Sequence, residues 1–200
     1  MEKKPVLFLA GPHASGKTHA ANLLEEQGYV SVDLGPLIRR FHEESGSNKN
    51  LGEWVSEQEE VYGKSFTDKI LLDHTKTILE KNEQAKGIVI IGSRSAKNIE
   101  FMRDGLGKSE SRIIYFEAHP SLLKERFENR EGKALSDNEF QYLLDKDKNM
   151  GLEDIKEIAD VKLLNNGSID EFEEEFMRTM STLDIEISSV KNRGIDGPKR

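Results

Sequence analysis

Residues 11–18 read GPHASGKT and follow the short apolar run Pro5–Ala10. They match the pattern G-x-x-x-x-G-K-[ST], which is meaningful where a strand precedes it and a helix follows it. The apolar run is typical of a buried strand, and Lys17–Gln27 has a helical pattern. We therefore predict a phosphate-binding loop that joins a first strand to a first helix.

Each residue type in this loop has a chemical reason to be there. Gly11 and Gly16 allow backbone angles and a close approach that a Cβ atom would prevent. The loop turns successive N–H groups around a phosphate at the positive end of the helix that follows. Lys17 reaches the β- and γ-phosphates of ATP, and the Thr18 hydroxyl is the predicted Mg²⁺ ligand. The predicted ATP-binding residues of the loop are Gly11, His13, Ala14, Ser15, Gly16, Lys17 and Thr18.

The rest of the chain alternates short apolar segments with amphipathic ones. Four further strands are predicted at Tyr29–Val32, Gly87–Ile91, Arg112–Phe116 and Val161–Leu164. Further helices are predicted at Leu37–Glu44, Leu51–Tyr62, Lys64–Glu83, Ala96–Leu106, Ser121–Arg130, Asp137–Lys148 and Ile169–Thr182. This alternation predicts a three-layer α/β fold with a five-stranded parallel sheet. We expect one domain over residues 1–183 and a flexible tail over 184–200.

Composition excludes several classes of protein. The sequence has 29 Lys and Arg against 37 Asp and Glu, a net charge of −8, which argues against nucleic-acid binding. A small anionic ligand in a local basic site remains compatible with that charge. There is no cysteine, so disulfides and thiolate metal sites are excluded. No apolar run approaches a membrane span, and the first one is too short for a signal peptide, so we predict a cytoplasmic protein.

Arginines follow the predicted strands where a parallel sheet binds its ligands. Arg39 comes after the second strand and Arg94 directly after the third. Arg126 and Arg130 lie four residues apart on one helix face. A guanidinium binds phosphate through two parallel hydrogen bonds, so these side chains are candidates for catalysis and substrate binding. The alternatives are solvated surface charges or, for Arg126 and Arg130, pairing with glutamates of their own helix.

The carboxylate that P-loop enzymes place near Mg²⁺ is less clearly marked. The third strand ends in Ile91 and carries no acid, whereas the second ends with Asp33 and the fourth with Glu117. Asp33 is the preferred candidate for assisting the metal or activating a substrate hydroxyl. For both acids the alternative is a helix cap or a solvated side chain.

Taken together, these segments resemble the small P-loop nucleotide kinases of the adenylate/cytidylate kinase and dephospho-CoA kinase group, most closely the archaeal-type predicted kinases. The resemblance extends from about Val6 to Phe176. After the phosphate loop it rests on VDLGPLIRR, NLGEWVSEQEEVYGKSFTDKIL, IVIIGSRS, LLKERFENREGK and ADVKLLNNGSIDEFEEEF, in that order.

The resemblance implies an ATP-dependent phosphotransferase acting on a nucleotide or nucleotide-like small molecule. Acceptor-binding helices are expected over about residues 35–84 and a short lid over about 127–150. Arg39 and Arg94 are implied to hold the acceptor phosphate. Arg126 and Arg130 are implied to flank the adenine and the transferring phosphate, with Asn165 near the adenine.

Three departures from the pattern support other interpretations. In the third strand, Ile91 stands where the group often has an acid. After the second strand, Gly35-Pro36 replaces the usual Gly-Asp. The later lid segment, LLDKDKNMG, has only Lys146 and Lys148 in place of arginines. Such losses would weaken the charge stabilisation on which phosphoryl transfer depends. The alternatives are therefore a catalytically weak ATP-binding regulatory or interaction module and, less favoured, an NTPase that performs mechanical work.

Overall fold

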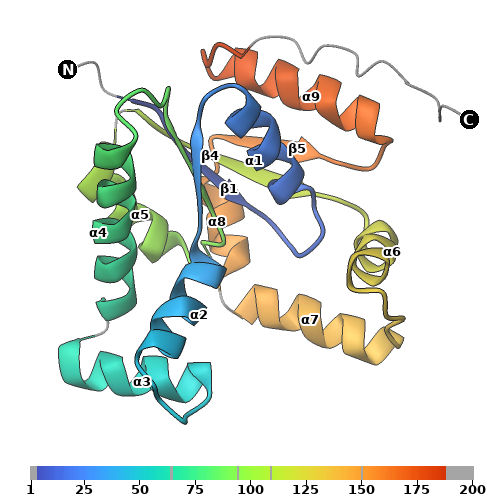
Figure 1. Ribbon diagram of the computed structural model, residues 1–200. Helices are drawn as coiled ribbons and strands as arrows, with labels where there is room; N and C mark the ends of the chain where they lie inside the picture. Colours follow the sequence, from blue (N-terminus) through green and yellow to red (C-terminus); the bar gives the residue numbers. More distant parts are fainter. Residues whose placement is uncertain (1–3, 64, 94, 109, 150, 188–200) are drawn as a thin grey trace, which may run out of the picture.

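The computed structural model describes residues 4–187 except 64, 94, 109 and 150. Its centre is a parallel sheet of five strands in the order β2-β3-β1-β4-β5 (Figure 1). The strands are β1 Val6–Ala10, β2 Val30–Asp33, β3 Ile88–Ile91, β4 Ser111–Glu117 and β5 Val161–Leu164. Every neighbouring pair is parallel, with Phe8 of β1 aligned between Ile90 and Ile113. The predicted α/β fold with a five-stranded parallel sheet is confirmed.

Alternation along the strands builds a hydrophobic layer on each face of the sheet. Leu7 and Leu9 point into one layer, while Val6 and Phe8 point into the other. Helices α1 (Lys17–Glu26) and α9 (Ile169–Thr182) cover the first face. Helices α4 (Phe66–Lys81), α5 (Ala96–Leu106) and α8 (Leu152–Ile158) cover the second. Because all five residues of β1 are buried, the strand is a continuous apolar run in the sequence.

Helices α2 (Leu34–Glu44) and α3 (Leu51–Tyr62) form an arm below the sheet in Figure 1. Helix α2 begins three residues before the predicted Leu37, because the Asp33 carboxylate caps it by accepting the Gly35 N–H at 3.0 Å. Trp54 of α3 is buried, and its ring centroid lies 5.4 Å from that of His42 and 6.1 Å from that of Phe66. The tryptophan therefore joins the helices of this arm to α4.

A second pair of helices lies on the opposite side of the sheet's lower end. These are α6 (Pro120–Glu131) and α7 (Asp137–Asn149), where the lid is expected. Helix α8 follows and is absent from the sequence-based predictions. It has seven residues, and its buried side chains are Leu152 and Ile155, too few for a helical period to be recognised.

The packed part of the chain continues past Leu183. Ile185 is buried in the layer under α1 and α9, so the segment expected to be a flexible tail begins with packed residues. Residues 188–200 lie outside the described part of the chain.

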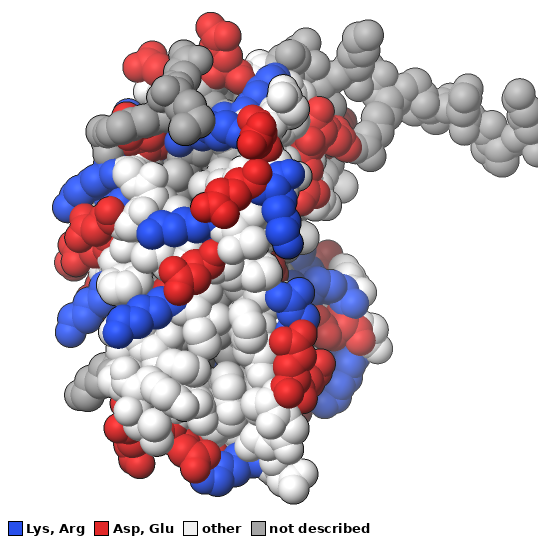
Figure 2. Space-filling model, turned by 60° about the vertical axis from the view of Figure 1, so that its left-hand side comes forward, with Lys and Arg blue, Asp and Glu red and all other residues white. Residues whose placement is uncertain are grey.

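No helix among the described residues is long and apolar enough to cross a membrane. Figure 2 shows basic and acidic side chains interspersed on the side that carries α4.

Candidate functional site

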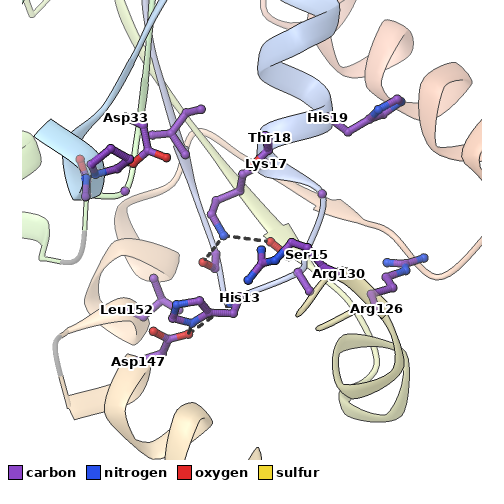
Figure 3. A pocket seen from close by; sticks show the side chains of 18 of the residues that line it. His13, Ser15, Lys17, Thr18, His19, Asp33, Arg126, Arg130, Asp147 and Leu152 are labelled. Carbon is purple, nitrogen blue, oxygen red and sulfur yellow. Dashed lines mark hydrogen bonds and ion pairs between the residues drawn. The ribbon is translucent and has the colours of Figure 1, made fainter. Parts of the chain in front are cut away.

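A cavity of about 500 Å³ opens where β1, β2 and β3 end. Its wall contains most of the phosphate loop, the residues that follow β2 and β3, and side chains of α6 and α7 (Figure 3). The sheet order brings these segments together, because parallel strands present all their carboxyl ends at one edge. Of the predicted loop residues, Gly11, His13, Ala14, Ser15, Gly16, Lys17 and Thr18 all line the cavity.

Two glycines give the loop its shape. Gly11 has φ +137°, and a Cβ atom there would stand 2.4 Å from the carbonyl oxygen of Phe116. Gly16 has φ +109°, and its Cβ would stand 2.6 Å from the amide nitrogen of Asn165. Both positions therefore combine a left-handed backbone with a close approach to a neighbouring segment, β4 at Gly11 and the residue after β5 at Gly16. Ala14 adopts φ +60°, a left-handed angle that is uncommon for residues other than glycine.

Lys17 is folded over the mouth of the loop. Its Nζ donates to the carbonyl oxygens of Gly11 at 2.8 Å and Pro12 at 2.6 Å, and to Ser15 Oγ at 3.4 Å (Figure 3). Helix α1 starts at Lys17 and has no acidic residue in its first turn, so the positive end of its dipole faces the cavity. This arrangement is suited to binding phosphate groups.

Asn165, just after β5, is hydrogen-bonded to the backbone of the phosphate loop. Its side-chain nitrogen donates to the Ser15 carbonyl at 3.0 Å, and Arg126 donates to both its carbonyl at 2.9 Å and its side-chain oxygen at 3.3 Å. Arg126 also donates to the Gly167 carbonyl at 3.2 Å. Asn165 is buried and is not among the cavity-lining residues. The structure therefore places it in a network that joins the phosphate loop, α6 and the segment before α9.

Arg126 and Arg130 both line the cavity, from one face of α6. Arg130 is exposed, and its Nε lies 2.8 Å from a Glu131 oxygen while its guanidinium lies 5.1 Å from the Phe127 ring centroid. The sequence left open the alternative that these arginines pair with glutamates of their own helix. Arg130 makes such a pair with Glu131. For Arg126 the partners are the backbone and side chain after β5.

Asp33 and Arg39 also line the cavity. Asp33 caps α2 and at the same time faces the cavity, so the capping role and the site role coincide. The neighbouring Arg40 pairs instead with Glu44 at 3.5 Å and is absent from the cavity wall. Arg94, predicted to bind the acceptor and assist catalysis, lies outside the described residues.

Glu117, the second candidate acid, is engaged elsewhere. Its Oε1 lies 2.9 Å from Nζ of Lys156 on α8, and this hydrogen bond raises the pKa of Lys156. Burial, followed by the nearby Glu153, Glu117 and Asp147, raises the pKa of Tyr115 well above its ordinary value. The Tyr115 hydroxyl therefore stays protonated at neutral pH. Of the two candidate acids, Asp33 is the one that lines the cavity.

Sequence reasoning missed Asp147 of α7, which is buried and lines the cavity. Its Oδ2 lies 2.7 Å from His13 Nδ1 and accepts the His13 backbone N–H at 3.2 Å (Figure 3). Lys146 and Lys148, considered as substitutes for lid arginines, are exposed on either side of it. A signal was present, because Asp147 lies four residues after Leu143 on the inward face of a predicted helix.

Ser93, two residues after β3, was also missed. It is 5% exposed and lines the cavity, and its Oγ has no hydrogen-bond partner among the described residues. A buried hydroxyl without a partner costs about 1–3 kcal/mol. Because Ile91 leaves the end of β3 without an acid, Ser93 is the polar side chain that this strand end contributes to the cavity.

We expect Ser93→Ala to leave the free energy of unfolding unchanged or to raise it, because the lost hydroxyl makes no hydrogen bond to any described residue. The matched control is Ser111→Ala, since Ser111 is equally buried but its Oγ donates to the Gly107 carbonyl at 2.6 Å. That variant should lose about 1 kcal/mol or more. Urea unfolding of both variants measures the difference, and equal losses would show that Ser93 has a partner in solution.

A parallel sheet in this order, with a phosphate loop after its central strand, is a P-loop kinase-like fold. A family described as AAA domain matches residues 7–144, and the chain belongs to that family. A UPF0200 protein of the archaeon Pyrococcus abyssi is 26% identical over 176 residues, which cover 85% of this chain and 92% of that protein.

Solved structures show the same fold. A shikimate kinase from Bacteroides thetaiotaomicron is similar with a TM-score of 0.55 and 18% identity, over 90% of this chain and 99% of that one. A gluconokinase from Sinorhizobium meliloti gives a TM-score of 0.56 and 15% identity, over 92% and 95%. The resemblance to P-loop kinases and to archaeal relatives, stated from the sequence, is confirmed.

Proposed function

We propose that the protein is an ATP-dependent phosphotransferase that transfers the γ-phosphoryl group of ATP to a nucleotide or nucleotide-like small molecule. One observation carries the proposal: a single cavity is lined by the phosphate loop and also by Asp33, Arg39 and Ser93, which lie at or after the ends of β2 and β3. An arginine beyond the phosphate loop suits an acceptor that carries its own anionic group.

On the ATP side, Lys17 and the loop N–H groups bind the β- and γ-phosphates. The Lys17 ammonium is already held at the mouth of the loop, so little rearrangement is needed when phosphate enters. Arg126 and Arg130 of α6 also line the cavity and supply further positive charge. Arg126 does so while it donates a hydrogen bond to the Asn165 carbonyl. These residues stabilise the charge that spreads over the transferring group.

The Thr18 hydroxyl and the Asp33 carboxylate face the same cavity, and both are oxygen donors of the kind that Mg²⁺ prefers. Thr18 would hold the ion that accompanies ATP, and Asp33 would reach it through a water, which leaves its carboxylate available to the acceptor. When bound, Mg²⁺ neutralises charge on the β- and γ-phosphates.

On the acceptor side, Asp33 accepts a hydrogen bond from the attacking oxygen and Arg39 binds the acceptor's anionic group, with Arg94 as a further candidate. The acceptor oxygen forms a bond to the γ-phosphorus as the bond to the β–γ bridging oxygen breaks. ADP leaves. If the attacking group is a hydroxyl, its proton passes to Asp33 or to solvent; an ionised phosphate oxygen has no proton to transfer. The chain's contribution is mainly to position these groups and to exclude water.

A catalytically weak ATP-binding module is the second candidate, and Asp147 favours it. In this site the lid helix presents a buried carboxylate to the phosphate loop, while its lysines stay outside. A lid that brings negative charge stabilises the transition state less than one that brings arginines. ATP binding without transfer to any acceptor would support this candidate over the first.

The test is ADP release from ATP·Mg²⁺ over a panel of nucleoside monophosphates, nucleosides and dephospho-CoA. With an accepted substrate, Arg39→Ala should raise the acceptor KM about tenfold or more and change the KM for ATP less than twofold, since Arg39 lines the cavity from the arm proposed to bind the acceptor. Arg40→Ala is the matched control, because Arg40 pairs with Glu44 outside the cavity. Equal effects of Arg39→Ala on both KM values would contradict the acceptor role.

A further inference from the structure

The ends of β2 and β3 place a carboxylate next to an uncharged wall of the cavity. Asp33, the last residue of β2, is aligned with Ile91, the last residue of β3. Its carboxylate lies close to the turn after β3, because a Cβ atom at Gly92 would stand 3.1 Å from Asp33 Oδ1. Ile91, Gly92 and Ser93 all line the cavity, and none of the three is charged. Asp33 therefore supplies the charge that the described residues of these two strand ends bring to the cavity.

The sheet order places this wall beside the phosphate loop. Strand β3 lies between β2 and β1, and the loop follows β1. Because parallel strands present their carboxyl ends at one edge, the loop lies across the end of β3 from Asp33. An acceptor oxygen that attacks a phosphate held by the loop therefore lies beside the Asp33 carboxylate and the uncharged end of β3.

These surroundings suit an alcohol as the attacking group better than a phosphate. An alcohol can donate its hydrogen to the carboxylate, which assists the attack. A phosphate monoester is an anion at neutral pH, so the Asp33 carboxylate would repel it. Ser93 adds a hydroxyl that can donate to or accept from a neutral group, and its Oγ has no hydrogen-bond partner among the described residues.

A cation for a separate anionic group lies near the same carboxylate, on α2. A Cβ atom at Gly35 would stand 3.4 Å from Asp33 Oδ1 and 3.6 Å from both terminal nitrogens of Arg39. The carboxylate and the guanidinium therefore flank one glycine, and both residues line the cavity. A guanidinium binds a carboxylate or a phosphate through two parallel hydrogen bonds. One compact molecule can thus present an alcohol to Asp33 and an anionic group to Arg39.

We propose that the acceptor is a compact alcohol with a separate anionic group, and that its hydroxyl oxygen attacks ATP. This inference rests on the proposed phosphotransferase function and narrows its acceptor. The hydroxyl oxygen forms a bond to the γ-phosphorus as the bond to the β–γ bridging oxygen breaks, ADP leaves, and the proton passes to Asp33. The product is a phosphate monoester. Attack by a phosphate oxygen would instead give a phosphoanhydride.

The first experiment gives the full chain ATP·Mg²⁺ and pairs of acceptors that differ only in their ribose hydroxyls. The pairs are nucleoside 5′-monophosphates and their 2′,3′-dideoxy analogues, and dephospho-CoA and nucleosides complete the panel. ADP release measures the rate, and phosphorus NMR distinguishes a monoester product from an anhydride. We expect monoester products and no transfer to the dideoxy analogues.

Two results would overturn the inference while the phosphotransferase function stands: transfer to a dideoxy analogue, or a nucleoside diphosphate formed from a monophosphate. Transfer to no member of the panel would contradict the proposed function itself, and the inference with it.

A second experiment removes the carboxylate and keeps the helix cap. In Asp33→Asn the asparagine caps α2 as well as aspartate does but cannot take up the proton. With an accepted alcohol we expect kcat to fall about 100-fold or more and the KM for ATP to stay within about twofold. The matched control is Asp73→Asn, which changes an exposed carboxylate of α4 outside the cavity wall and should leave both constants unchanged.

An unchanged or higher kcat in Asp33→Asn is the result that an attacking phosphate predicts, because the variant removes the repulsion. Recovery of the rate at high Mg²⁺ concentration would show that Asp33 acts through the ion. Either result would overturn the role of Asp33 in accepting the proton of the alcohol.

Discussion

Replacing Lys17 by alanine should weaken ATP binding by at least about 100-fold and reduce phosphoryl transfer to background. The Lys17 ammonium already donates to the Gly11 and Pro12 carbonyls at the mouth of the loop, where a phosphate would enter. Its loss removes charge-assisted hydrogen bonds, each contributing about 1.5–3 kcal/mol. Titration with a fluorescent ATP analogue measures the binding, and ADP release measures the transfer.

The control for this variant is Lys76→Ala, which removes the same charge from an exposed position on α4. It should bind ATP as the unaltered protein does. Circular dichroism should show that both variants keep the native secondary structure. If Lys17→Ala retained full affinity, the nucleotide would have to bind elsewhere than in the loop, and the proposed function would lose its basis.

Gly11→Ala should lower the free energy of unfolding by about 3 kcal/mol or more. The φ angle of +137° and the 2.4 Å approach of a Cβ atom to the Phe116 carbonyl both oppose a side chain. Left-handed strain costs about 1–2 kcal/mol and overpacking about 1–3 kcal/mol. The Phe116 backbone cannot yield easily, because it belongs to β4 and its side chain is fully buried. Urea unfolding measures the loss.

Gly46→Ala separates the cost of left-handed backbone strain from the cost of the close approach of a Cβ atom to a neighbouring group. Gly46 has φ +65°, but nothing lies within 4 Å of the Cβ atom that alanine would add. This variant should lose only the conformational part, about 1–2 kcal/mol. If both variants lost the same amount, the close approach at Gly11 would have no energetic weight, and the loop would be less tightly held than the structure indicates.

The sheet and its loop could be predicted because their signals are local. Buried parallel strands are continuous apolar runs, and the phosphate loop has a fixed spacing of glycines before Lys17. The helices Leu51–Tyr62, Ala96–Leu106 and Ile169–Thr182 have the predicted bounds. Helices Leu51–Tyr62 and Ile169–Thr182 begin where the sequence predicts because the residues before them, Asn50 and Ser168, both form capping boxes.

What could not be predicted depends on contacts between distant segments. Asn165 braces Ser15 across 150 positions of sequence, and Asp147 meets His13 across 134. No spacing rule links such residues, because only the sheet order brings them together. The seven-residue helix α8 was missed for a different reason: it is too short to display a helical period.

Trp54 gives the protein a built-in optical probe. It is the single tryptophan of the sequence, and it lies buried in the arm of α2 and α3, against His42 and Phe66. It does not line the cavity, so a nucleotide in the phosphate loop has no direct contact with it. Its intrinsic emission therefore reports on rearrangement of α2 and α3, the arm proposed to bind the acceptor, without attaching a dye.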